Sequence, residues 1–93
     1  MDKLSEAEIT ARLRRLSGWS REGGAIRKQF TFPKFADGIR FVDRVAAAAD
    51  ALDHHPDMDI RYTAITMTLS THSAGGLTAR DFELAERIER ERR

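Results

Sequence analysis

The stretch FADGIRFVDRVAAAADALDHHP, residues 35–56, decides the fold. Its apolar side chains recur with helical periodicity over about five turns. Pro56 biases the preceding residue away from helical dihedral angles, so the pair His54-His55 is expected at the C-terminal end of a long amphipathic helix. The apolar positions are Phe35, Ile39, Val42, Val45, Ala46, Ala49 and Leu52.

On the N-terminal side of this helix, the pattern predicts a short helix and then a hairpin. Ser5 and Glu8 are spaced as a capping box, which marks a helix start. A brief strand is expected at 18–22, and Gly23-Gly24 is a hairpin turn signal. Residues 25–32 alternate between apolar and polar, as a second strand does.

On the C-terminal side, a second hairpin and a last helix are expected. Residues 58–62 and 65–69 both alternate, with a turn near Thr63 and the β-branched content typical of strands. Thr78 and Asp81 repeat the capping-box spacing and mark the start of the last helix.

The order αββαββα predicts an α+β fold in which three helices pack on one face of a four-stranded antiparallel sheet. Residues 1–93 are expected to form a single domain. The other face of the sheet is polar and rich in threonine, free for a ligand or a neighbouring subunit.

Composition narrows the function classes. With 41% hydrophobic and 33% charged residues, and no apolar run near the roughly 20 residues of a membrane span, the chain is expected to be soluble. We expect a cytoplasmic protein, since no signal-peptide pattern opens the sequence. Zero cysteines rule out disulfides and Cys-ligated zinc. Sixteen basic and fifteen acidic residues nearly cancel, which disfavours direct binding to nucleic acid.

The three histidines are the candidate catalytic groups, because imidazole gives and takes protons near neutral pH. Spacing alone leaves three readings open for His54, His55 and His72. The pair at the helix end is placed for a favourable charge near the helix dipole, the three rings are possible metal ligands, and two rings are possible acid and base.

Three carboxylates accompany them. Asp50 precedes His54 by four residues, at the spacing that places it to orient that imidazole, and a solvated surface role is the alternative. Asp53 is a candidate acceptor for a substrate amino group or simply surface polarity. Asp81 is expected to cap the last helix, and a role in substrate binding is compatible with capping.

The pattern Asp50-x3-His54-His55-Pro56-x5-Tyr62-x9-His72-x8-Asp81 resembles the signature of the pterin-4a-carbinolamine dehydratases. The resemblance extends over nearly the whole chain and implies the same αββαββα order. It also implies a homo-oligomer, a tetramer or a dimer. Met58 departs from the family at a place where an aromatic residue is often found, and Asp50 stands where Glu is common.

By this resemblance, the substrate is a 4a-hydroxytetrahydropterin, which an aromatic amino acid hydroxylase leaves behind, and the product is the quinonoid dihydropterin. No metal or organic cofactor is implied. We interpret His54 and His72 as the proton-transfer pair and His55 as a substrate-binding or polarising group, with Asp50, Asp53 and Asp81 as candidate substrate-binding residues. The alternative is a non-catalytic interaction protein, since the family also serves in animals as a dimerisation cofactor for a homeodomain transcription factor.

Overall fold

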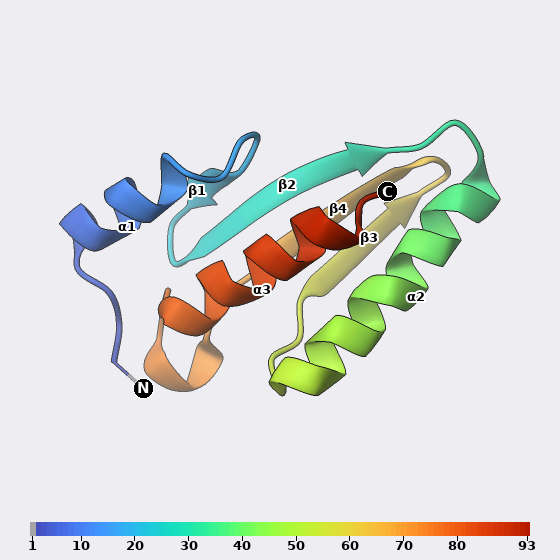
Figure 1. Cartoon of the computed structure of the whole chain (residues 1–93). Coiled ribbons are helices and arrows are strands. Elements are labelled where there is room, and N and C mark those ends of the chain that lie inside the picture. Colours follow the sequence, from blue (N-terminus) through green and yellow to red (C-terminus); the bar gives the residue numbers. More distant parts are fainter. Residues whose placement is uncertain (1) are drawn as a thin grey trace.

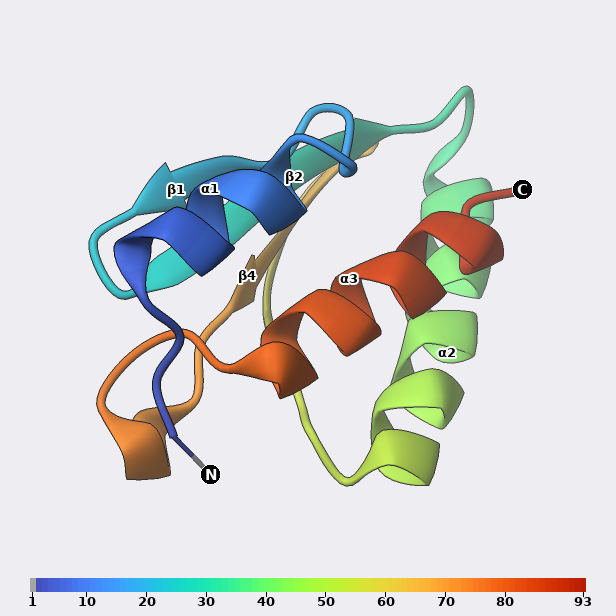
Figure 2. The ribbon, with the colours of Figure 1, turned by 60° about the vertical axis from the view of Figure 1, so that its left-hand side comes forward.

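Two hairpins form one antiparallel sheet, and three helices cover one of its faces (Figure 1, Figure 2). The structure, a computed structural model, describes residues 2–93. The predicted αββαββα order is confirmed, with one short 3-10 helix added before the last helix. The elements are α1 (Glu6–Leu13), β1 (Ser20–Glu22), β2 (Ala25–Thr31), α2 (Phe35–Leu52), β3 (Asp57–Arg61), β4 (Ala64–Leu69), η1 (His72–Ala74) and α3 (Ala79–Glu91).

The strands lie in the order β1-β2-β4-β3, so β2 and β4 are central and β3 is an edge strand. Antiparallel pairing places Ile26 opposite Leu69 and Phe30 opposite Ile65. These four residues are buried on the helix-covered face, and the residues that alternate with them make the polar face.

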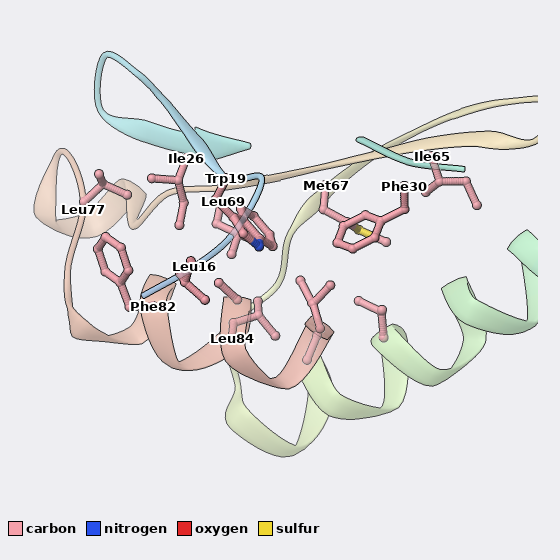
Figure 3. Close-up of a cluster of buried hydrophobic side chains, with 14 of the residues drawn as sticks. Leu16, Trp19, Ile26, Phe30, Ile65, Met67, Leu69, Leu77, Phe82 and Leu84 are labelled. Atoms are coloured by element: carbon pink, nitrogen blue, oxygen red, sulfur yellow. The ribbon is translucent and has the colours of Figure 1, made fainter. Parts of the chain in front are cut away.

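The core fills the space between the sheet and the helices (Figure 3). The rings of Phe30 and Phe41 pack with their centroids 5.0 Å apart. At Gly38, α2 approaches β4 so closely that a Cβ atom would lie 2.8 Å from Cδ1 of Ile65. The buried helix residues that meet the sheet include Ile9, Val45, Ala49, Phe82, Leu84, Ala85 and Ile88.

Both predicted capping boxes are confirmed. Ser5 and Glu8 exchange side-chain and backbone bonds at the start of α1, and Thr78 and Asp81 do so at the start of α3. The long helix α2 ends at Asp53, whose φ of 51° places it in the left-handed region. This residue turns the chain sharply out of the helix just before the histidine pair.

Across residues 2–93, no helix combines the length and the apolar character needed to cross a membrane.

Candidate active site

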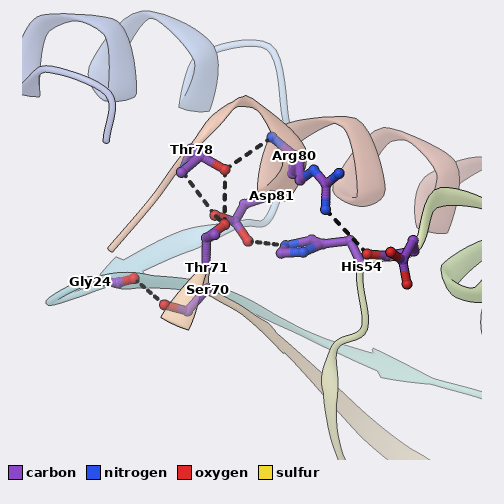
Figure 4. Close-up of polar contacts among 8 residues, drawn as sticks. Gly24, His54, Ser70, Thr71, Thr78, Arg80 and Asp81 are labelled. Atoms are coloured by element: carbon purple, nitrogen blue, oxygen red, sulfur yellow. Dashed lines mark hydrogen bonds and ion pairs between the residues drawn. The ribbon is translucent and has the colours of Figure 1, made fainter. Parts of the chain in front are cut away.

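The imidazole of His54 is bound by the carboxylate of Asp81, which comes from another helix (Figure 4). Nε2 of His54 lies 2.6 Å from Oδ1 of Asp81. The His54 side chain is 10% exposed and that of Asp81 is 0% exposed, so the bond is shielded from water. It joins the C-terminal end of α2 to the N-terminal end of α3.

The second oxygen of Asp81 caps α3. Oδ2 accepts the backbone N–H of Thr78 at 2.9 Å and the hydroxyl of Thr71 at 2.8 Å. One carboxylate therefore closes the capping box with one oxygen and holds His54 with the other. The expected capping role of Asp81 is confirmed, and the same side chain lies in the candidate site.

The contacts around Asp81 allow its hydrogen-bond donors to be assigned. The single hydroxyl proton of Thr71 goes to Asp81, so at its 2.8 Å contact with Oγ1 of Thr78 it accepts. Thr78 Oγ1 in turn accepts the backbone N–H of Arg80 at 3.2 Å. Oδ2 of Asp81 thus receives two donors, and Oδ1 is left to face the ring of His54. With Asp81 as a carboxylate, the proton of this contact belongs to Nε2 of His54.

The other ring nitrogen of His54, Nδ1, has no hydrogen-bond partner within residues 2–93. Among residues 2–93, His54 makes one side-chain hydrogen bond, through Nε2. No buried side-chain nitrogen or oxygen in that part of the chain lacks a partner, so Nδ1 reaches solvent. In the neutral ring, this nitrogen carries the lone pair.

His55 has a different partner and a different environment. Its Nε2 lies 2.8 Å from Oδ1 of Asp50, and the two side chains are 57% and 78% exposed. The expectation that Asp50 orients His54 is therefore wrong. Residues four positions apart share a face only within a continuing helix, whereas the left-handed turn at Asp53 directs His54 toward α3 and leaves His55 beside Asp50.

Asp53 makes its contact to α3 through its backbone, and its carboxylate is exposed. Its carbonyl oxygen accepts a bond from Nη1 of Arg80 at 3.3 Å. Sequence reasoning missed Arg80 and Thr71, because both act through contacts between distant segments that spacing does not encode. The capping pattern at Thr78 was the available signal for that end of α3.

His72 is exposed at the start of η1, directly after Thr71. The loop that carries it is closed by two backbone bonds between Thr71 and Gly76, of 3.0 and 3.3 Å. His72 thus follows directly on the residue whose hydroxyl binds Asp81. Within residues 2–93, no group of three or more His, Cys, Asp or Glu side chains is arranged to hold a metal ion.

The fold and the site define a small α+β protein with one histidine bound by a buried carboxylate and a second histidine on a closed loop, a set of groups suited to moving protons.

Comparison with known proteins identifies the family. The family model described as "Pterin 4 alpha carbinolamine dehydratase" matches residues 2–91, and the chain belongs to this family. A relative from Roseiflexus sp. (strain RS-1), named "Putative pterin-4-alpha-carbinolamine dehydratase", is 53% identical over 94% of each chain. One of the same name from Mycobacteroides abscessus is 49% identical over 96% of this chain and 95% of its own.

A solved structure agrees with the fold as well. The "transcriptional coactivator/pterin dehydratase" from Brucella melitensis superposes with a TM-score of 0.95 at 33% identity, covering 99% of this chain and 100% of its own. The resemblance that the histidine motif indicated is confirmed.

Proposed function

We propose that the chain dehydrates 4a-hydroxytetrahydropterins to quinonoid dihydropterins by acid–base catalysis with its histidines. The observation that carries this proposal is the 2.6 Å bond between Nε2 of His54 and the buried carboxylate of Asp81, which orients the ring and leaves Nδ1 without a partner within residues 2–93. Family membership supports the substrate class.

The reaction needs two proton transfers and no oxidant. A proton is delivered to the 4a-hydroxyl, the bond between C4a and oxygen breaks, and a proton leaves a ring nitrogen, so that water departs without a change in oxidation state. We assign His54 Nδ1 as the base, because it carries the lone pair, and His72 as the acid. His55, exposed beside Asp50, serves substrate binding.

The carboxylates have unequal parts in this proposal. Asp81 keeps the His54 ring in one orientation and stabilises the imidazolium that forms when Nδ1 takes a proton. We assign Asp53 and Asp50, both exposed at the end of α2, to the binding of polar atoms of the pterin, and their exposure supports this role.

Substitution of the two proton-transfer histidines tests the proposal. His54→Ala and His72→Ala should each slow dehydration by at least about tenfold while the protein stays folded. The assay follows 4a-hydroxytetrahydropterin generated by an aromatic amino acid hydroxylase and subtracts the uncatalysed rate. Wild-type rates in both variants would rule out this mechanism.

We also propose a pathway role, a location and an oligomeric state, as the family implies. The chain would act in tetrahydropterin recycling in the cytoplasm, together with an aromatic amino acid hydroxylase, and would form a homotetramer or a dimer. Three exposed apolar side chains support self-association, namely Phe35, Ile60 and Tyr62, which are 49%, 42% and 75% exposed. Ile60 belongs to the edge strand β3, whose outer backbone groups are open to pairing. Light scattering of the purified chain decides between monomer, dimer and tetramer.

The competing function is a protein-interaction role without catalysis. The name of the Brucella melitensis structure includes such a role, "transcriptional coactivator", for that protein. Binding of a reduced pterin separates the two. An interaction module would show no binding at about 1 mM pterin, whereas the dehydratase would bind it.

A further inference from the structure

We propose that Thr71 is a positioning residue that fixes both proton-transfer histidines at once. The inference rests on the proposed dehydratase function, and it adds a residue that the histidine motif does not contain. Thr71 touches neither substrate nor reacting atoms in this proposal. It acts through its side chain on His54 and through its backbone on His72.

The side-chain route runs through Asp81. Thr71 is buried, at 6% exposure, and its hydroxyl donates to Oδ2 of Asp81 at 2.8 Å. Oδ1 of the same carboxylate holds Nε2 of His54. The Thr71 hydroxyl, as one of two donors to Oδ2, therefore orients the carboxylate so that Oδ1 faces His54. Through that orientation it keeps the proton of His54 on Nε2 rather than Nδ1.

The backbone route runs through the loop that carries His72. The N–H of Thr71 donates to the carbonyl of Gly76, the N–H of Gly76 donates back, and the N–H of Ala74 also donates to the carbonyl of Thr71. These bonds anchor the loop on both sides of His72. Thr71 also bonds Asp81, which holds His54. The positions of His72 and His54 therefore both depend on Thr71.

The Thr71 hydroxyl is itself held in place, because its oxygen accepts a hydrogen bond from the Thr78 hydroxyl. Thr78 Oγ1 lies 2.8 Å from Thr71 Oγ1 and supplies a proton to it, since the Thr71 proton is used on Asp81. Removing the Thr71 hydroxyl takes one of two donors from Oδ2 and leaves the Thr78 hydroxyl without its acceptor. The backbone bond from Thr78 to Asp81 does not depend on Thr71, so the cap of α3 survives the change.

Matched variants separate positioning from packing. Thr71→Val keeps the shape and removes the hydroxyl, and Thr71→Ser keeps the hydroxyl and removes the methyl group. Thr10→Val is the control, since Thr10 is exposed in α1 and lies outside both the sheet and the network around Asp81. The readouts are kcat and KM, the pH profile of kcat/KM, and the 15N shifts of the His54 ring.

We expect Thr71→Val to lower kcat by roughly tenfold to a hundredfold with KM changed less, because the lost contact acts on proton transfer rather than on binding. Its pH profile should shift, and its His54 15N shifts should show a growing share of the tautomer protonated on Nδ1. Thr71→Ser should restore kcat to within about threefold of the wild-type value, and Thr10→Val should have the wild-type kcat.

Wild-type kcat, pH profile and 15N shifts in Thr71→Val would overturn the inference while leaving the dehydratase function intact. If the wild type itself does not dehydrate the pterin, the proposed function fails, and the 15N shifts alone decide whether Thr71 sets the His54 tautomer. Should Thr71→Val not fold, Thr71→Cys takes its place with the same expectation, because a thiol is a weak donor.

Discussion

His54 and Asp81 join the C-terminal end of α2 to the N-terminal end of α3 through one bond of 2.6 Å. Asp81 is at the same time the third residue of the α3 capping box. A helix cap and a candidate catalytic contact therefore share one buried carboxylate. Any change to this side chain affects stability and chemistry together, and the two effects have to be separated by the choice of substitution.

Asp81→Asn makes that separation. Thr71 and Thr78 both donate to Oδ2, so the amide oxygen of Asn takes that place and the NH2 group turns to His54. Nε2 then has to accept, which moves the ring proton to Nδ1. We expect kcat to fall by about a hundredfold or more, with the protein still folded. Steady-state kinetics and 15N shifts of His54 measure both effects.

Asp50→Asn is the comparison for this variant, since it changes the exposed partner of His55 and should act on KM rather than on kcat. Its unfolding free energy should change by less than about 1 kcal/mol and its kcat by less than about threefold. Equal losses of kcat in the two variants would contradict the unequal roles of His54 and His55.

The two capping boxes offer a matched pair. Thr78→Ala and Ser5→Ala each remove an N-cap hydroxyl, and each should cost roughly 1 kcal/mol of unfolding free energy, with the buried Thr78 at the higher end. Thr78→Ala should also lower the dehydration rate, because Thr78 belongs to the network around Asp81. Urea unfolding and the dehydration assay test both variants, and a lowered rate in Ser5→Ala would mean that lost stability alone explains the effect.

Much of this molecule follows from local patterns. Helical periodicity over 35–52, the Gly23-Gly24 turn and both capping boxes depend on neighbouring residues, and each is confirmed. The motif also led to the family. These features are predictable because the residues that determine them lie within a few positions of one another.

The internal geometry of the site was not predictable in the same way. His54 and Asp81 are 27 positions apart, and Thr71 meets Asp81 only after β4 and α3 have packed. The pairing of Asp50 with His55 depends on the left-handed conformation of Asp53, which a helical spacing rule does not contain. Three-dimensional packing, rather than spacing, decides which histidine each carboxylate binds.

The start of α1 provides a test by pH. Arg21 donates two bonds to the carboxylate of Glu6, and this hydrogen bonding lowers the pKa of Glu6 below its ordinary value of 4.5. The backbone N–H of Ser5, bonded at 2.9 Å, is the main cause that lowers the pKa of Glu8. Both lowered values mean that the charged forms stabilise the folded state above about pH 4.5 and that this contribution is lost as pH falls.

Arg21→Gln should therefore raise the pKa of Glu6 toward its ordinary value and leave the pKa of Glu8 where it is, since Glu8 depends on Ser5. An NMR titration of the two carboxyl carbons reads both groups in one sample. A shift of both values, or of neither, would show that the Arg21 contact in the structure does not persist in solution.

Asp53→Gly isolates the carboxylate of the residue at the end of α2. Glycine adopts the φ of 51° without strain, and the backbone carbonyl that binds Arg80 is kept, so the fold should be unchanged or more stable by up to about 1 kcal/mol. If the carboxylate binds the pterin, KM should rise by about tenfold with kcat nearly unchanged, because a lost ground-state contact weakens binding of substrate and transition state alike. Asp53→Asn, which keeps a polar acceptor, should show a smaller rise. An unchanged KM in Asp53→Gly would assign this residue to the helix end alone, and the polar contacts of the substrate would then have to come from His55 and Asp50.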